Sequence, residues 1–244
     1  MKRFPLIILI TLMFIFSGFA SAPQPKPADS AALDSVLKKM DSLAANFHGA
    51  QANFEWDIYQ KVIDEIDDVE TGTIYYRRHG KEVEMMAEVK RSGSSLASLA
   101  PEEKYVLFSG GKLRLYSRKI DQVQEFDLGK NHSDYDSYIV LGFGGSGQEL
   151  VKTFDVTYGG AETIDGVSTS KLQLVPKSEK IRGTYNQIFL WIDDRGISVQ
   201  QKFLSPQGDY KLAKYSSIKL TDKISEEVFK LKTTNKTQVV TPRG

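Results

Sequence analysis

Few residues in this 244-residue chain have the types and spacing that catalysis requires. His48, His79 and His132 lie far apart, and none has the H-x-x-x-H or H-x-E spacing of a metal or proton-transfer site. Ser146 is followed by Gly147-Gln148, so it does not sit in the G-x-S-x-G turn of a hydrolase nucleophile. The absence of Cys excludes a catalytic thiol, a thiolate metal site and a disulfide framework. We therefore expect no catalytic residues, no metal site and no cofactor.

The stretch from Gly142 to Gly147 satisfies the G-x-G-x-x-G pattern of dinucleotide-binding turns. That function needs a parallel βαβ unit, in which the N-terminus of the helix faces the pyrophosphate. Here the neighbouring segments have the pattern of antiparallel hairpins, so we expect a flexible loop and no dinucleotide. Ser146 and Glu149 have the spacing of a capping box, which predicts a short helix that ends near Phe154.

Five acidic residues between Asp64 and Glu70 are a possible calcium site. An EF-hand-like loop needs Gly near its sixth position, where this chain has Val69. The cluster is more typical of a solvated hairpin tip.

The first 22 residues have the three parts of an export signal. Lys2 and Arg3 are followed by an apolar run from Leu6 to Phe16 and then by Ala20-Ser21-Ala22, a small-x-small cleavage pattern. A membrane anchor is the alternative, but eleven apolar residues are too few, because a bilayer core needs about 20 in a helix. We expect cleavage after Ala22 and an exported protein, with residues 23–244 as one domain.

The composition is that of a packed globular protein, with 41% hydrophobic and 26% charged residues and a formal charge of +1. That balance argues against a nucleic-acid partner, since binding to phosphates depends on an excess of cations.

The elements that must position any site are one helix and many strands. Asp29 or Ser30 can cap a helix whose apolar residues recur at i, i+3, i+4 and i+7 up to Phe47. From Phe54 onward the period changes to two, with Gly-rich and Asp-rich turns between the runs. The pattern predicts a mainly β (α+β) fold: about ten antiparallel strands in one curved sheet, open or nearly closed, with the helix on one side.

One face of this sheet carries large apolar residues, which could form a packed core or line a cavity. A helix of about 18 residues is short for covering ten strands, and the mostly apolar, Gly-rich segment from Tyr135 to Phe154 could be a movable cover. The residues that we expect to line a cavity are Trp56, Ile58, Val83, Met85, Leu107, Leu113, Leu115, Phe189 and Trp191.

Several stretches together resemble the periplasmic lipoprotein carriers of the LolA family. They are the end of the first helix at Phe47-His48-Gly49-Ala50, the 54–59 strand, residues 72–78, the 104–116 hairpin, residues 172–177, the turn at Asp194-Arg195-Gly196 and the 225–229 turn. The resemblance implies an incomplete antiparallel barrel with a mid-chain helical lid, which holds the acyl chains of lipoproteins.

Site residues and partners also follow from the resemblance. Arg78 matches the arginine that hydrogen-bonds the lid closed, although His79 stands where the family has Pro. Val83 and Met85 match cavity-lining positions. The expected lid residues are Ile139, Val140, Leu141 and Phe143. The implied partners are acylated lipoproteins, an ATP-driven release complex in the inner membrane and an outer-membrane receptor, and we expect a monomer.

The leading hypothesis is a non-enzymatic periplasmic carrier that moves lipoproteins from the inner to the outer membrane. The first alternative is a lipid- or lipoprotein-binding module that senses the state of the envelope. The second is an exported hydrolase whose site is assembled from distant residues.

Overall fold

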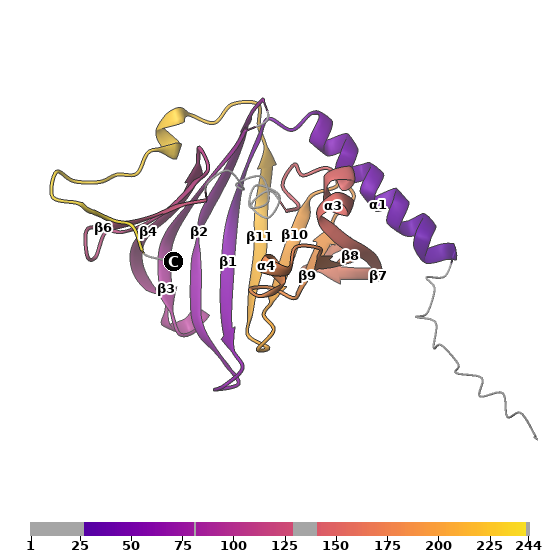
Figure 1. Ribbon diagram of the computed structural model, residues 1–244, viewed down its shortest axis with the longest axis horizontal. Coiled ribbons are helices and arrows are strands. Elements are labelled where there is room, and N and C mark those ends of the chain that lie inside the picture. The colour runs from indigo at the N-terminus through magenta and orange to yellow at the C-terminus, as the bar shows by residue number, and fades with distance from the viewer. Residues whose placement is uncertain (1–26, 81, 129–140, 243–244) are drawn as a thin grey trace, which may run out of the picture.

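The computed structural model describes residues 27–80, 82–128 and 141–242, so the expected signal peptide lies outside the described residues. Twelve strands form one sheet (Figure 1). The strands are β1 Gly49–Gln60, β2 Glu65–His79, β3 Glu82–Gly93, β4 Ala100–Ser109, β5 Lys112–Ser117, β6 Gln122–Asp127, β7 Phe154–Ile164, β8 Val167–Pro176, β9 Gln187–Ile192, β10 Ser198–Leu204, β11 Tyr210–Leu220 and β12 Gln238–Val240. The helices are α1 Pro27–Ala45, α3 Gly147–Thr153 and α4 Glu179–Arg182, with 3-10 turns η1 Leu96–Ser98 and η3 Glu226–Phe229.

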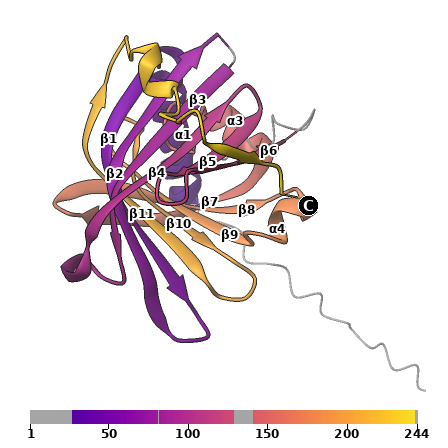
Figure 2. The same cartoon turned by 90° about the vertical axis from the view of Figure 1, so that its left-hand side faces the viewer.

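The strand order is β12-β6-β5-β4-β3-β2-β1-β11-β10-β9-β8-β7, and every pairing is antiparallel except that of β12 with β6. The sheet curls strongly but does not close, since β12 and β7 are its two edges (Figure 2). This confirms the predicted incomplete barrel with an N-terminal helix and a mid-chain helix, with twelve strands in place of about ten.

Helix α1 buries the apolar stripe that its sequence predicts. Val36 and Met40 are 3% and 1% exposed and pack into a core formed by β7 to β10 together with Leu150 of α3. Phe47, just after the helix, enters a second core over β1, β2 and β3. We call the sheet face that carries these two cores the inner face.

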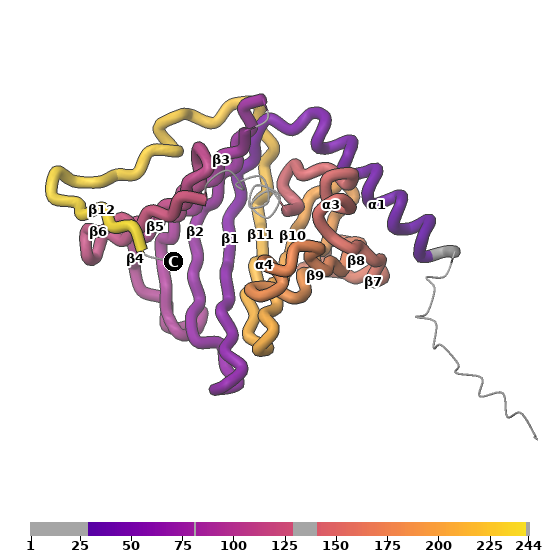
Figure 3. Tube along the Cα trace, viewed as in Figure 1, coloured from indigo at the N-terminus to yellow at the C-terminus, as the bar shows by residue number. Residues whose placement is uncertain are grey.

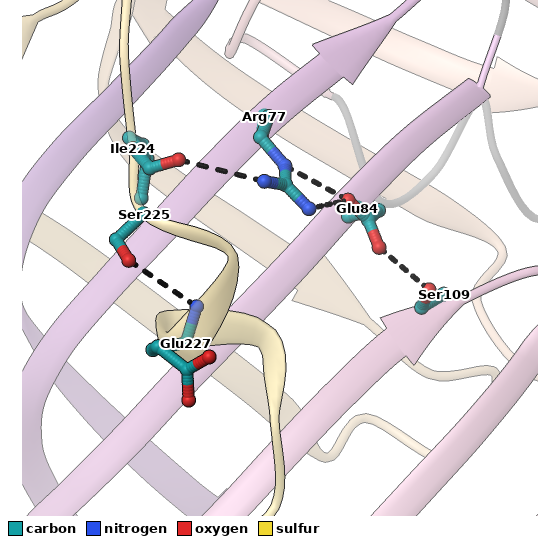
Figure 4. Close-up of polar contacts among 6 residues, drawn as sticks. All are labelled: Arg77, Glu84, Ser109, Ile224, Ser225 and Glu227. Atoms are coloured by element: carbon teal, nitrogen blue, oxygen red, sulfur yellow. Dashed lines mark hydrogen bonds and ion pairs between the residues drawn. The ribbon is translucent and has the colours of Figure 1, made fainter.

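The outer face is covered in part by the C-terminal segment, residues 221–240, which crosses the sheet from the end of β11 to β6 (Figures 1 and 3). Phe229 of η3 packs there on Met86 and Leu107. Arg77 donates to Glu84 Oε2 and to the Ile224 carbonyl (Figure 4).

Candidate functional site

Residues 141–146, here called the cover segment, lie on the inner face between β2 and β10. Phe143 is fully buried, stacks on Tyr76 with ring centroids 4.5 Å apart, and meets Tyr215 edge-on at 4.7 Å. Burial raises the pKa of both tyrosines, so their hydroxyls stay neutral. The cover segment thus supplies an aromatic side chain to the core of the sheet.

Three carbonyl groups of the cover segment accept hydrogen bonds from the sheet. Gln201 Nε2 donates to the Leu141 carbonyl, and the backbone N–H of Ser198 donates to the Gly142 carbonyl at 2.9 Å. Arg78 Nη2 donates to the Gly144 carbonyl at 2.8 Å. Two of these bonds come from β10 and one from β2, so the segment is held from both sides.

The glycines of the cover segment are required by close packing. Gly142 and Gly144 have φ angles of +72° and +82°, where residues with a side chain are strained. A Cβ at Gly142 would lie 2.2 Å from Ser198 Cβ, and one at Gly144 would lie 2.4 Å from the Phe47 ring. Residues 141–146 form a loop as expected, and the glycines of this G-x-G-x-x-G stretch let it approach other elements closely. The helix predicted after it is α3, capped by Ser146, whose hydroxyl accepts from the Glu149 N–H.

A pocket of about 300 Å³ lies further along the sheet, between Trp56 on β1 and the strands β4 to β6. Its apolar lining includes Val89, 2% exposed, and the half-buried Val106 and Leu115. Exposed Ile120, in the turn between β5 and β6, also contributes to the lining.

Three charged residues line the same pocket: Glu70, Lys104 and Lys211. Glu70 Oε1 accepts from Lys104 Nζ at 2.8 Å. Lys211 Nζ lies 3.6 Å from the centroid of the Trp56 ring, and burial lowers its pKa to about 8 although Glu70 acts in the opposite direction. The pocket is therefore apolar on one part of its wall and carries one net positive charge.

Six of the nine expected cavity residues lie on the inner face by strand register: Trp56, Ile58, Val83, Met85, Leu113 and Leu115. Only Trp56 and Leu115 line the described pocket. Met85 is 8% exposed and belongs to the core beside the cover segment, with Leu113 packed against that core.

The expectation that Leu107, Phe189 and Trp191 face inward was wrong. Leu107 packs on the outer face with Met86 and Phe229. Phe189 and Trp191 alternate with inward-facing Leu190, and Trp191 Nε1 donates to Glu162 Oε2 at 2.6 Å. The reason is that these strands are apolar on both faces, so their sequences contain no alternation that fixes which side is inside.

Of the four expected lid residues, Leu141 and Phe143 lie in the cover segment and are 2% and 0% exposed. Ile139 and Val140 lie outside the described residues.

The charged residues of the pocket were missed by sequence reasoning. A signal for them exists, because Glu70 lies an even number of residues from inward-facing Ile74 and Tyr76 and so shares their face. Lys211 shares a face with Ala213 and Tyr215 in the same way. Glu70 was assigned to a solvated hairpin tip, whereas the turn occupies residues 61–64 and Glu70 lies within β2.

Within residues 27–80, 82–128 and 141–242, no three His, Asp or Glu side chains are grouped so that they could hold a metal ion. No helix of this described part has the length and apolar character needed to cross a membrane.

No protein-family model matches the chain, and no curated protein matches it. Among solved structures, an uncharacterized conserved protein from Thermus thermophilus is similar with a TM-score of 0.51 and 12% identity, over 88% of this chain and 99% of that one. Two structures of lower similarity are the LolA superfamily protein NE2245 from Nitrosomonas europaea (TM-score 0.41, 14% identity, 82% and 97% coverage) and the Mycobacterium tuberculosis lipoprotein LppX (TM-score 0.46, 11% identity, 80% and 98% coverage).

The Thermus thermophilus structure shares the overall fold of this chain. At these identities the likeness is one of fold, and it leaves the activity to be argued from the site.

Proposed function

We propose that this chain is a non-enzymatic periplasmic carrier that binds the acyl chains of lipoproteins and moves them from the inner to the outer membrane. The observation that carries the proposal is the pocket of about 300 Å³ on the inner face of a sheet that does not close. Trp56, Val106 and Leu115 give it an apolar wall against which an acyl chain can lie.

The energy of acyl burial suits transport. Each buried CH₂ group contributes about 0.8 kcal/mol, so a chain of about 16 carbons gains on the order of 10 kcal/mol against water. A volume of about 300 Å³ is at the lower end for small-molecule sites, so the pocket holds part of a multi-chain cargo. Incomplete enclosure fits a protein that must surrender what it binds.

The cover segment is the proposed lid, and Arg78 is its proposed latch. Phe143 fills space between Tyr76 and Tyr215 that acyl chains could occupy if the segment moved away. The bond from Arg78 to the Gly144 carbonyl holds the segment in its observed place. In this scheme an ATP-driven complex of the inner membrane loads the open form, and an outer-membrane receptor accepts the cargo.

The test is mass spectrometry of what copurifies with the tagged protein from native periplasm. We expect acylated lipoproteins with the unmodified chain and a clear loss with Leu115→Glu, which places a carboxylate in the pocket wall. Val167→Glu is the matched control, because Val167 is 40% exposed at the start of β8. Absence of acylated species from the unmodified sample, or equal recovery with Leu115→Glu, contradicts the carrier. Recovery of a regulatory protein in their place favours the envelope-sensing alternative.

A further inference from the structure

The ammonium group of Lys211 lies in the pocket and has no anionic partner among the residues that the structure describes. Its nearest contact is the face of the Trp56 ring, 3.6 Å from Nζ to the centroid. No carboxylate within the described residues lies within ion-pair distance of it. A cation that is partly removed from water and not neutralised raises the free energy of the empty pocket.

Among the described residues that line the pocket, Glu70 is the one acidic residue, and it is already paired. Glu70 pairs with Lys104 at 2.8 Å and acts on Lys211 only at longer range. The strand neighbours of Lys211 are Ile58 on β1 and Phe203 on β10, which carry no charge. Beyond Ile58, β2 contributes Asp68, whose pKa is raised by burial and by Glu70.

Hydrogen-bonding and apolar groups surround this cation. Gln122 and Gln124 of β6 bring amide side chains to the lining, and Val89, Val106 and Leu115 bring apolar ones. A ligand that satisfies both parts of the wall has an anionic head and an apolar body.

We propose that this pocket binds an anionic amphiphile, a single acyl chain whose carboxylate or phosphate head pairs with the Lys211 ammonium. The inference rests on the proposed function, because an acyl chain occupies the same pocket. The anionic head goes beyond that function, since the ester- and amide-linked chains of a lipoprotein have no free carboxylate. Trp56 holds the ammonium through its ring face, and the chain packs on Val89, Val106 and Leu115. Free inorganic anions bind more weakly, since they leave this apolar wall in contact with water.

Fluorescence of Trp56 provides the readout. The chain has two tryptophans, and the other, Trp191, lies on the outer face, so Trp191→Phe leaves Trp56 as the sole tryptophan. The Trp191→Phe variant is titrated with dodecanoate, with dodecanol and with inorganic phosphate. The same titrations are repeated on the unmodified chain by calorimetry. Lys211→Met removes the cation and keeps the length of the side chain.

Lys202→Met is the matched control. Lys202 also places its Nζ over an aromatic ring, 3.8 Å from the centroid of Tyr210. Strand register puts it on the outer face, opposite Phe189 and Leu212. It therefore reports the effect of removing a cation–π lysine from the same sheet away from the pocket.

We expect dodecanoate to bind about tenfold or more tightly than dodecanol, as one charge-assisted bond provides. Lys211→Met abolishes this preference and keeps the affinity for dodecanol, and Lys202→Met changes neither. If Lys211→Met prefers dodecanoate over dodecanol as strongly as the unmodified chain does, the proposed pairing of Lys211 with an anionic head is wrong. The proposed acyl carrier is not contradicted by that result. If inorganic phosphate binds as tightly as dodecanoate, the proposed amphiphilic ligand is wrong, because the acyl chain then contributes nothing to the affinity. Failure of both amphiphiles to bind the unmodified chain overturns the proposed function itself.

A second measurement needs no variant and so is independent of folding defects. Dodecanoate is ionised throughout pH 7 to 9, whereas Lys211, with a pKa of about 8, loses its charge over that range. Dodecanoate affinity of the unmodified chain therefore falls as the pH rises from 7 to 9, while dodecanol affinity is unchanged. Parallel pH profiles for the two ligands overturn the role of Lys211.

Discussion

Arg78 of β2 donates from Nη2 to the Gly144 carbonyl at 2.8 Å, which joins the end of a strand to the cover segment. Its neighbour in sequence, Arg77, points to the other face and pairs with Glu84 at 2.5 Å. Two adjacent arginines thus hold two different segments, the cover segment on the inner face and the C-terminal segment on the outer face.

Arg78→Leu should release the cover segment. One charge-assisted hydrogen bond contributes about 1.5–3 kcal/mol, which is enough to change an open-closed equilibrium tenfold or more. We expect faster hydrogen exchange across residues 141–150 than in the unmodified chain. The variant should still take up cargo but should pass it onward more slowly than the unmodified chain does. Arg77→Leu is the control and should speed exchange in residues 224–230 only. Unchanged exchange over 141–150 in Arg78→Leu would show that Arg78 is not a latch.

Gly144→Ala should destabilise the protein through two effects that can be separated. The φ angle of +82° strains any side chain, and the new Cβ would lie 2.4 Å from the Phe47 ring. Gly160→Ala supplies the strain alone, because its φ is +100° and nothing lies within 4 Å of the new Cβ. We expect a loss of about 1–3 kcal/mol for Gly144→Ala and a smaller loss for Gly160→Ala, measured by urea unfolding. Equal losses in the free energy of unfolding would show that the Phe47 ring moves aside without destabilising the protein.

The fold could be predicted from the sequence where its patterns are local. Period-two alternation and turn residues identified the hairpins, and the apolar stripe with its period of 3.6 identified α1. Strand β12 was not predicted, because it has three residues and pairs in parallel with β6, far away in sequence. Pairings of that kind leave no periodic signal in a single sequence.

The site was predictable in part, and its failures have two physical causes. Leu107 and Trp191 lie in strands whose outer faces are also covered, by the C-terminal segment and by pairing with Glu162, so apolar character did not fix their direction. The charged part of the pocket depends on Glu70, Lys104 and Lys211, which three different strands bring together. The proximity of these three side chains depends on the register of the folded sheet, which local sequence patterns do not specify.

Leu115→Glu should remove acyl binding while the fold persists. Leu115 is half-buried in the pocket wall, so Glu at this position replaces apolar surface that a bound chain contacts with a carboxylate that favours water. Met85 is less suitable for this test, because it is 8% exposed within the core and its replacement would affect folding. We expect the affinity for a fluorescent fatty-acyl probe to fall about tenfold or more, against little change in Val167→Glu. Equal binding by both folded variants would count against an acyl pocket.

Glu84 should make the protein sensitive to acid. Burial alone would raise the pKa of this carboxyl, but hydrogen bonds from Ser109 and Arg77 outweigh burial and hold the pKa below its ordinary value of 4.5 (Figure 4). A group with a lowered pKa in the folded state stabilises the protein fully above its unfolded-state value, and the contribution disappears as the pH falls through the folded-state pKa.

Glu84→Gln should therefore lower the free energy of unfolding by about 1–3 kcal/mol at pH 7 and by much less below the folded-state pKa. Urea unfolding from pH 7 to pH 3 measures both limits, with exposed Glu65→Gln as the control. Because Arg77 also contacts the Ile224 carbonyl and the Phe229 ring, loss of its carboxylate partner should loosen the C-terminal segment at pH 7. A difference between Glu84→Gln and the unmodified chain that stays constant over the whole pH range would contradict this account, since an ion pair must lose its effect once the carboxyl is protonated.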